Sequence, residues 1–233
     1  MKIKIFGDGA SVNDMIKANK DGIVQGFTTN PSLMKKAGIT NYEKFAKEVL
    51  KEIIDLPISF EVFSDDFDLM EREALIISSW GKNVNVKIPI TNSKGESSIP
   101  LIRKLLDKKV FVNVTAILTM EQIQKLSEII EPEDCVIVSV FAGRIADTGK
   151  DPTSIVEEAV RRFYTYEHVQ VLWASTRELL NIIQAENCWC DIITVPTNIL
   201  SKLSMIGKDL TELSLDTVKM FYNDAKSCNY KLI

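Results

Sequence analysis

A lysine within an apolar, strand-like segment is the most unusual chemical feature of the chain. In residues 83–90, NVNVKIPI, apolar residues recur at every second position from Val84 to Ile90, which predicts a strand with one apolar face. Lys87 falls on the opposite face together with Asn85. Burial disfavours the charged form of an amine, and a neutral amine is a nucleophile toward carbonyl carbon. The segment therefore predicts Schiff-base chemistry on a ketone or an aldehyde.

Polar residues fall on the same face of several other strand-like segments. In a parallel barrel the outward side chains pack under helices, so we expect the β-branched residues of each segment to point outward. The other parity then gives an inner surface with six polar residues, each near the carboxyl end of its segment: Asp8, Glu61, Lys87, Asn113, Thr115 and Ser139. Carboxylates beside an amine can move protons during imine formation. The alternative is a purely structural ion-pair cluster, but such clusters usually stabilise a fold less than apolar packing does.

Eight segments with apolar residues at a period of two are candidates for the strands that position these residues. They alternate with amphipathic segments of helical length and cover residues 2–6, 23–27, 58–63, 83–88, 110–115, 136–141, 169–174 and 191–196. This alternation predicts a closed (β/α)8 barrel rather than an open doubly wound sheet, and active sites of such barrels lie at the carboxyl ends of the strands. Neither a GxGxxG motif nor a P-loop motif follows the early segments, which argues against nucleotide-binding alternatives.

Several residues have the sequence context of helix caps. Three of them have the spacing of a capping box: Ser11, Thr119 and Ser175. Asn30 precedes Pro31 and is expected to cap a helix whose first residue is that proline. Gly81 is expected to end the helix that begins near residue 65.

Composition favours a soluble enzyme over a nucleic-acid or membrane protein. The 233 residues carry a net charge of −4, so nucleic acid is not an expected partner. Neither a leader nor a membrane span is recognised, and we expect a cytoplasmic protein. The four cysteines have no CxxC spacing and are expected to be reduced, and His168 is expected to be a surface residue rather than a catalytic one. We expect one domain over residues 1–233, with residues 214–229 forming a last helix that packs on the barrel or on another subunit.

An anion site is suggested by residues just past the sixth and seventh segments. Arg144 follows the sixth segment in FAGRIADTG, and Ser175 and Arg177 follow the seventh in ASTRELL. Backbone N–H groups at the start of a helix from Ser175 would add to such a site. For each arginine a surface salt bridge is the alternative, and for Ser175 simple helix capping is the alternative.

Five stretches of the chain resemble signature segments of the transaldolases, in order and in spacing. They are GFTTNPSLM, VKIPIT, NVTAI, VSVFAGRIADTG and LWASTREL, and the resemblance runs from Phe6 to about Pro196. It points to the short-chain subfamily, which includes the fructose-6-phosphate aldolases. The resemblance implies a (β/α)8 class I aldolase that uses no metal and no organic cofactor, acts on sugar phosphates and forms a homo-oligomer through its C-terminal helix.

The resemblance also implies roles for individual residues. Lys87 falls at the position of the Schiff-base lysine, Asp8 at that of the acid/base for the C4 hydroxyl, and Glu61 at that of the carboxylate that moves protons through a water held also by Thr115. Polar residues implied around the dihydroxyacetone unit are Thr28, Asn30, Asn113 and Ser139, of which Thr28 and Asn30 come from the resemblance alone. Residues implied at the substrate phosphate are Arg144, Ser175 and Arg177.

Two positions separate the subfamilies, and two others depart from the family pattern. Fructose-6-phosphate aldolases carry glutamine where Glu61 stands and tyrosine where Phe141 stands, so we expect transfer of a dihydroxyacetone unit rather than its release. Gly9 stands where the family usually has threonine, and Trp173 where it usually has a small residue. Trp173 is expected to share the inward parity of Ser175, where it either narrows the pocket near the phosphate or is a bulky residue of the inner core. The alternatives are an aldolase that releases dihydroxyacetone, an enzyme for an unusual sugar in polysaccharide synthesis, and a non-catalytic sugar-phosphate-binding barrel.

Overall fold

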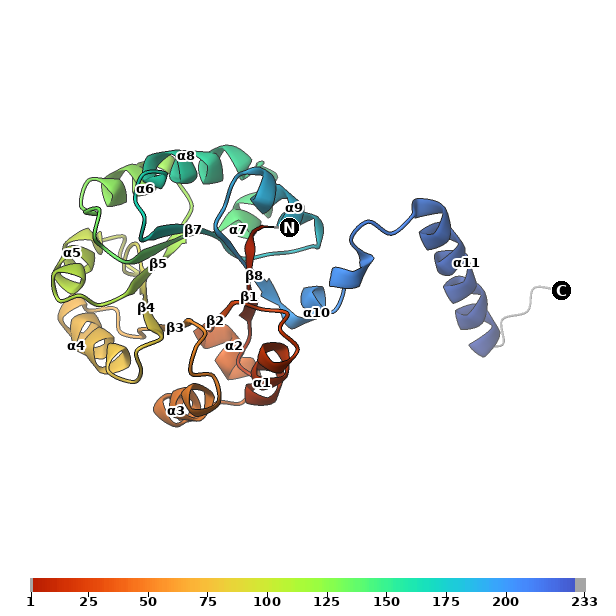
Figure 1. The fold of residues 1–233 in the computed structure, drawn as a ribbon, viewed down its shortest axis with the longest axis horizontal. Coiled ribbons are helices and arrows are strands. Elements are labelled where there is room, and N and C mark those ends of the chain that lie inside the picture. Colours follow the sequence, from red (N-terminus) through yellow and green to blue (C-terminus); the bar gives the residue numbers. More distant parts are fainter. Residues whose placement is uncertain (1, 229–233) are drawn as a thin grey trace. The chain divides into compact units, whose positions relative to one another are not determined.

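Eight parallel strands close into one barrel in chain order in the computed structural model, which describes residues 2–228 (Figure 1). The strands are β1 (Lys4–Asp8), β2 (Gly26–Thr28), β3 (Ile58–Glu61), β4 (Val84–Pro89), β5 (Val112–Ile117), β6 (Val136–Val140), β7 (Val169–Trp173) and β8 (Ile192–Pro196). Each overlaps one of the eight predicted segments. The predicted (β/α)8 barrel is confirmed.

Helices surround the ring of strands in Figure 1. Those of the barrel unit are α1 (Val12–Lys20), α2 (Pro31–Lys36), α3 (Tyr42–Glu52), α4 (Phe67–Ser78), α5 (Ile99–Asp107), α6 (Met120–Ser127), α7 (Ala142–Ala146), α8 (Thr153–Phe163), α9 (Leu180–Asn187) and α10 (Thr197–Leu200). Ser11 and Asn30 cap α1 and α2, and Thr119 forms the full capping box of α6 with Gln122, as predicted.

Two predicted helix boundaries are wrong. Helix α9 begins at Leu180 and not at Ser175, because Ser175 has a φ of +66° and lies in the preceding loop. Helix α4 ends at Ser78, before Gly81, because the hydroxyls of Ser78 and Ser79 donate to the carbonyls of Leu75 and Ile76. The Ser79 N–H also donates to the Ile76 carbonyl at 3.1 Å, so the last turn closes before Gly81.

An apolar layer crosses the barrel interior and fixes the face of β7. Phe6, Ile137, Leu172, Ala174 and Ile192 form this buried cluster. Because Leu172 and Ala174 point inward, Trp173 between them points outward and is buried at 1% exposure. The prediction that Trp173 narrows the pocket is wrong.

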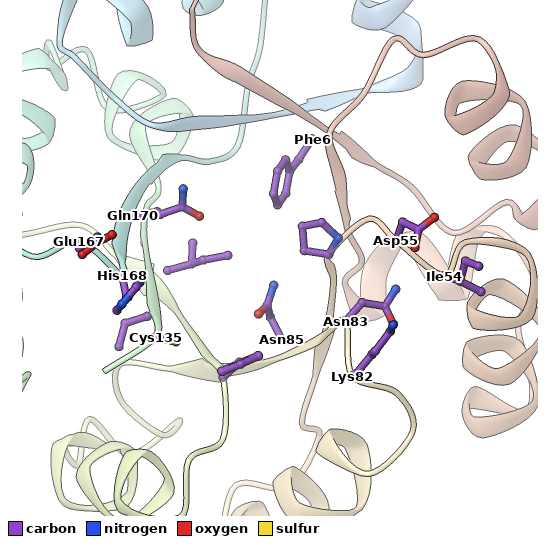
Figure 2. A pocket seen from close by; sticks show the side chains of 14 residues that line it. Phe6, Ile54, Asp55, Lys82, Asn83, Asn85, Cys135, Glu167, His168 and Gln170 are labelled. Carbon is purple, nitrogen blue, oxygen red and sulfur yellow. The ribbon is translucent and has the colours of Figure 1, made fainter. Parts of the chain in front are cut away.

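The amino-terminal end of the barrel holds a cavity without the predicted catalytic groups. This cavity of about 550 Å³ is lined by Asn85, His168 and Gln170 among others (Figure 2). Phe6 and Ile137 of the apolar layer also line it, and none of the six polar residues predicted on the inner surface does. His168 lies exposed just before β7, as predicted. This leaves the carboxyl-terminal ends of the strands as the place for the predicted catalytic groups.

Residues from Ser201 onward form a second compact unit, separate from the barrel unit that ends at Leu200. It contains a short 3₁₀ helix, η1 (Leu203–Met205), and α11 (Leu210–Ser227). The predicted last helix, 214–229, begins four residues earlier than expected because Asp209 caps it, and residue 229 lies outside the described residues. The single domain over residues 1–233 stays a prediction.

Two further findings concern the described residues 2–228. No helix in this part of the chain is long and apolar enough to cross a membrane. All four cysteines within it have free thiols.

Candidate active site

A pocket of about 390 Å³ opens at the carboxyl-terminal ends of the strands. Its lining includes every predicted site residue except Asn113: Asp8, Thr28, Asn30, Glu61, Lys87, Thr115, Ser139, Phe141, Arg144, Ser175 and Arg177. These residues come from seven of the eight strands or the loops that follow them. The barrel thus gathers them at the end where enzymes of this fold place their chemistry.

Lys87 and Glu61 form an ion pair within this pocket. They are register partners on β4 and β3, so their side chains start side by side on the inner face. Lys87 Nζ donates to Glu61 Oε2 at 3.0 Å and to the backbone carbonyl of Thr29 at 2.8 Å. Lys87 is only 6% exposed. The carbonyl of Thr29 was not predicted, because main-chain acceptors in a loop leave no signal in the residue types.

Asp8 lies at the end of β1 and has an environment unlike that of an exposed carboxylate. Its Oδ1 accepts a hydrogen bond from the Thr28 hydroxyl at 2.9 Å. Burial raises the pKa of Asp8 above its ordinary value, and the nearby Lys87 amine and the Thr28 hydrogen bond offset only part of that rise. A carboxyl group with a raised pKa holds a proton more readily than an exposed carboxylate does, which suits it to accept and return one.

A chain of buried hydrogen bonds lies beneath the pocket. Ser139 Oγ donates to Asn113 Oδ1 at 2.6 Å, and Asn113 Nδ2 donates to Ser59 Oγ at 3.0 Å. Asn113 is fully buried and Ser139 lines the pocket, so Asn113 acts on the pocket by orienting the Ser139 hydroxyl. Ser59 is not among the residues predicted for the site.

The hydroxyl of Thr115 is buried and has no hydrogen-bond partner among residues 2–228. A buried polar group without a partner is unfavourable unless a ligand or a water completes it. Because Thr115 also lines the pocket, its hydroxyl is available to a bound molecule there.

Thr194 on β8 is a pocket residue that sequence reasoning missed. Its hydroxyl is hydrogen-bonded to that of Thr28, which in turn donates to Asp8. In the segment DIITVP, Ile193 and Val195 flank Thr194 at a period of two, and this pattern is the signal that places Thr194 on the inner face.

The loops after β6 and β7 are packed against each other through Gly143. A Cβ atom at Gly143 would lie 1.6 Å from the backbone oxygen of Ser175, so only glycine fits there. The Gly143 N–H also donates to the carbonyl of Ala174 at 3.2 Å. This contact brings Arg144 of α7 and Arg177 of the next loop to one rim of the pocket.

The two arginines at this rim differ in their partners. Arg177 makes a bidentate ion pair with Asp147, with Nε to Oδ1 at 3.0 Å and Nη2 to Oδ2 at 2.6 Å. This bond lowers the pKa of Asp147. The Arg144 guanidinium lines the pocket and has no side-chain hydrogen bond within the described part of the chain, although its charge also helps to lower the pKa of Asp147. Its N–H groups are therefore available to an anion.

The N–H groups expected to bind an anion after Ser175 are already occupied. Asn181 Oδ1 accepts from the N–H groups of Arg177 and Glu178, at 2.9 and 3.1 Å. The predicted contribution of a helix start at Ser175 is therefore wrong. These two N–H groups are therefore not available to an anion at this rim.

Known proteins match this chain over nearly its full length. The family model described as Transaldolase/Fructose-6-phosphate aldolase matches residues 5–232. A protein of Thermoanaerobacter sp. named "Probable transaldolase" is 34% identical over 218 residues, which is 93% of this chain and 95% of that protein. One of the same name from Thermoplasma volcanium is 35% identical over 204 residues, 86% of this chain and 87% of that protein.

A solved structure supports the fold alone. The crystal structure titled as 3-hexulose-6-phosphate synthase has a TM-score of 0.58 and 16% sequence identity, and the match covers 84% of this chain and 90% of that one. The family model and the two relatives named above match in sequence, and they confirm the predicted resemblance. The chain belongs to the transaldolase/fructose-6-phosphate aldolase family.

Proposed function

We propose that this chain is a transaldolase that carries a dihydroxyacetone unit on Lys87 between sugar phosphates. The donor would be a ketose phosphate, fructose 6-phosphate or sedoheptulose 7-phosphate, and the acceptor an aldose phosphate, as in the cytoplasmic pentose phosphate pathway. The observation that carries the proposal is the nearly buried Lys87 amine, bonded to Glu61 in a pocket that also contains Asp8. Family membership supports the same reaction class.

The first half of the reaction forms the Schiff base. Glu61 first takes a proton from the Lys87 ammonium within their ion pair, and the lone pair of Nζ then attacks the C2 carbonyl of the ketose. The resulting carbinolamine loses water to give an imine. Glu61, 3.0 Å from Nζ, moves the protons of these steps together with a water that the free Thr115 hydroxyl helps to hold.

The second half breaks and remakes a carbon–carbon bond. Asp8 takes the proton of the C4 hydroxyl while the C3–C4 bond breaks, and the aldose phosphate leaves with C4 as its aldehyde carbon. The electron pair of the broken bond stays on the three-carbon unit as an enamine. The enamine attacks the aldehyde of the acceptor, Asp8 returns the proton to the new hydroxyl, and hydrolysis of the imine frees Lys87. The raised pKa of Asp8 suits both proton transfers.

Residues around the bound sugar would fix its orientation. We propose that Thr28, Asn30 and Ser139 contact the dihydroxyacetone unit, with Asn113 acting through Ser139. Arg144 would hold the phosphate, with Ser175 and Arg177 beside it at the same rim.

Trapping with borohydride tests the proposal directly. Wild-type protein incubated with fructose 6-phosphate and borohydride should gain a reduced three-carbon or six-carbon adduct on Lys87, located by peptide mass spectrometry. Lys87→Met should gain none. An intact mass without any adduct on the wild type would contradict the proposal and would favour a non-catalytic sugar-phosphate-binding barrel.

A second candidate is an aldolase that releases free dihydroxyacetone. Glu61 and Phe141 both line the pocket, and they are the positions at which this chain differs from the fructose-6-phosphate aldolases. Phe141→Tyr is therefore expected to raise release of dihydroxyacetone in the absence of an acceptor. If the wild type releases free dihydroxyacetone as fast as it transfers the unit to an acceptor, the result would favour the aldolase.

The physiological sugar can be tested by varying the acceptor. Gly9 leaves open space, since a Cβ there would meet only Thr197 Oγ1, at 4.0 Å. An acceptor screen with fructose 6-phosphate as donor would separate the pentose phosphate sugars from an unusual sugar destined for a polysaccharide.

We further propose that the protein is a homo-oligomer through α11. Taken by itself, the unit from Ser201 onward buries none of the α11 side chains, although Leu215, Val218 and Tyr222 are apolar and share one face. A single helix cannot cover its own apolar face, so burial of these residues requires another surface. Multi-angle light scattering of the whole chain should give the mass of an oligomer of two or more chains, each of 26.2 kDa, and the mass of a single chain would contradict this proposal.

A further inference from the structure

Strand β2 is too short to pair with the end of β3. The register joins them only at Phe27 with Ile58 and at Thr28 with Ser59. On the side of β3 that faces β2, the Ser59 carbonyl accepts a hydrogen bond from the Thr29 N–H at 3.1 Å. On the side that faces β4, the Val62 N–H donates to the Lys87 carbonyl at 3.2 Å. Successive residues of a strand turn their backbone groups to alternate sides. The N–H and C=O of Glu61 therefore point toward β2, beyond the point where β2 has ended.

The hydroxyl of Tyr42, the first residue of α3, takes the place of the missing strand. It accepts a hydrogen bond from the Glu61 N–H at 2.8 Å and donates one to the Glu61 carbonyl at 3.1 Å. Both backbone groups of one residue are thus satisfied by a single side-chain oxygen. Burial raises the pKa of Tyr42, so the hydroxyl stays protonated and keeps its donor.

The ring of Tyr42 is held in place by three aromatic neighbours. Its centroid lies 6.0 Å from that of Phe60 and 5.3 Å from that of Trp80, both in edge-to-face geometry. Phe63 is half exposed and packs on the same ring, with the two ring centroids 4.5 Å apart. These contacts fix the ring independently of its hydroxyl. Removal of the hydroxyl alone would therefore leave the packing intact.

We infer that Tyr42 is a positioning residue that fixes the backbone of Glu61 and so holds its carboxylate against Lys87. The inference rests on the proposed function, because it assigns Tyr42 an effect on the proton transfers made by Glu61. Glu61 is the last residue of β3, and the chain leaves the barrel immediately after it. Without the Tyr42 bonds, Glu61 would keep only the support of its neighbours in the chain and its ion pair with Lys87. Catalytic groups lose much of their effect when they move by about 1 Å.

Tyr42→Phe tests this inference. With fructose 6-phosphate as donor and an aldose phosphate as acceptor, we expect kcat to fall about tenfold and the KM values to change by less than about twofold. The rate of borohydride trapping on Lys87 should fall by the same factor. Tyr164→Phe, at a residue that is 84% exposed, is the matched control and should behave as the wild type does.

A double-mutant cycle separates positioning from a general loss of stability. If Tyr42 acts through the Glu61 carboxylate, Tyr42→Phe should not slow trapping further in a Glu61→Ala background. A purely structural role predicts the same factor in both backgrounds. Activities are compared below the melting temperature of every variant. If the phenylalanine variant is too unstable, Tyr42→Trp, which offers a donor but no acceptor to the Glu61 N–H, should show the same fall in kcat.

The outcomes distinguish this inference from the proposed function. An active wild type with an unchanged kcat in Tyr42→Phe overturns the inference alone, and so does an equal fall in both backgrounds. A wild type that forms no adduct on Lys87 overturns the proposed function and the inference together.

Discussion

The Glu61 carboxylate and the Lys87 amine are paired across adjacent strands at 3.0 Å, and the register of β3 and β4 sets them side by side before any side-chain packing is considered. The amine is the more buried of the two, since the exposed fraction of its side chain is 8% against 19% for Glu61. Glu61→Gln keeps the size and a hydrogen-bonding oxygen but removes the charge. We expect imine formation, measured by the trapping rate, to slow by about 10²-fold. A rate equal to that of the wild type would exclude Glu61 from the proton transfers.

Replacement of Asp8 should separate imine formation from bond cleavage. In Asp8→Asn the Lys87 amine still meets the ketose, but no base takes the proton of the C4 hydroxyl. We expect transfer to fall by about 10²- to 10⁴-fold, and borohydride to trap the six-carbon donor rather than the three-carbon unit. The mass of the adduct on Lys87, measured by mass spectrometry, distinguishes the six-carbon donor from the three-carbon unit. A three-carbon adduct at the normal rate would assign the base to another residue.

The raised pKa of Asp8 also predicts an effect on stability. Its folded-state pKa lies above the unfolded value because of burial, so the folded state binds the proton more tightly than the unfolded state does. The favourable contribution is complete below the unfolded pKa, near pH 4, and is lost as the pH rises through the folded value. Asp8→Asn should therefore melt about 2–4 °C higher than the wild type at pH 7, with a smaller difference at pH 4. A melting temperature at pH 7 below that of the wild type would contradict this account.

A methyl group at Gly143 should disturb the rim where the two arginines lie. Because a Cβ there would lie 1.6 Å from the Ser175 oxygen, Gly143→Ala must push the loop after β7 away. We expect a melting temperature lower by several degrees and a KM for phosphorylated sugars raised by about tenfold or more. Gly9→Ala, in the loop after β1, is the control for adding a methyl group, since its Cβ meets nothing closer than 4.0 Å. Equal effects of the two substitutions would mean that the Gly143 contact does not shape the rim.

Removal of Arg144 tests the anion site. Its guanidinium has no hydrogen-bond partner among the described residues, so Arg144→Ala costs the fold little, but would remove a charged hydrogen bond to a substrate phosphate worth about 1.5–3 kcal/mol. The KM for fructose 6-phosphate should rise by about 10- to 100-fold, whereas the KM for an unphosphorylated acceptor should not change. Arg161→Ala on α8, where the arginine pairs with Glu158, is the control for charge alone. If the KM values of phosphorylated and unphosphorylated sugars rise together, the phosphate is held elsewhere.

The parity of apolar residues was sufficient to predict most of the pocket, because a barrel interior leaves few choices for a polar side chain. Asp8, Glu61, Lys87 and Thr115 lie in the pocket as that parity implied. The same alternation places Trp173 outward with Val169 and Val171, whereas Ser175 lies beyond the end of β7 and does not continue the alternation. Sequence patterns extend only as far as the regular strand does.

Features formed by the loops could not be predicted in this way. The clamp of Tyr42 on Glu61 joins a helix start to a strand end through two backbone groups, and backbone groups are identical in every residue. The occupied N–H groups after Ser175 depend on an asparagine that lies inside the next helix. The Tyr42 bonds and the Asn181 bonds both depend on how distant segments of the chain meet in space. The residue types within one segment do not predict such a meeting.

The absence of any side chain between Gly143 and the Ser175 carbonyl has a consequence for binding. Two neighbouring loops that touch backbone to backbone have no room to shift independently, so the rim that carries Arg144 is already formed before a ligand arrives. Binding of an anion there should therefore carry no entropic cost of ordering a loop, and its affinity should depend on charge and desolvation. The rim at Arg144 is thus expected to bind an anion without first closing over it.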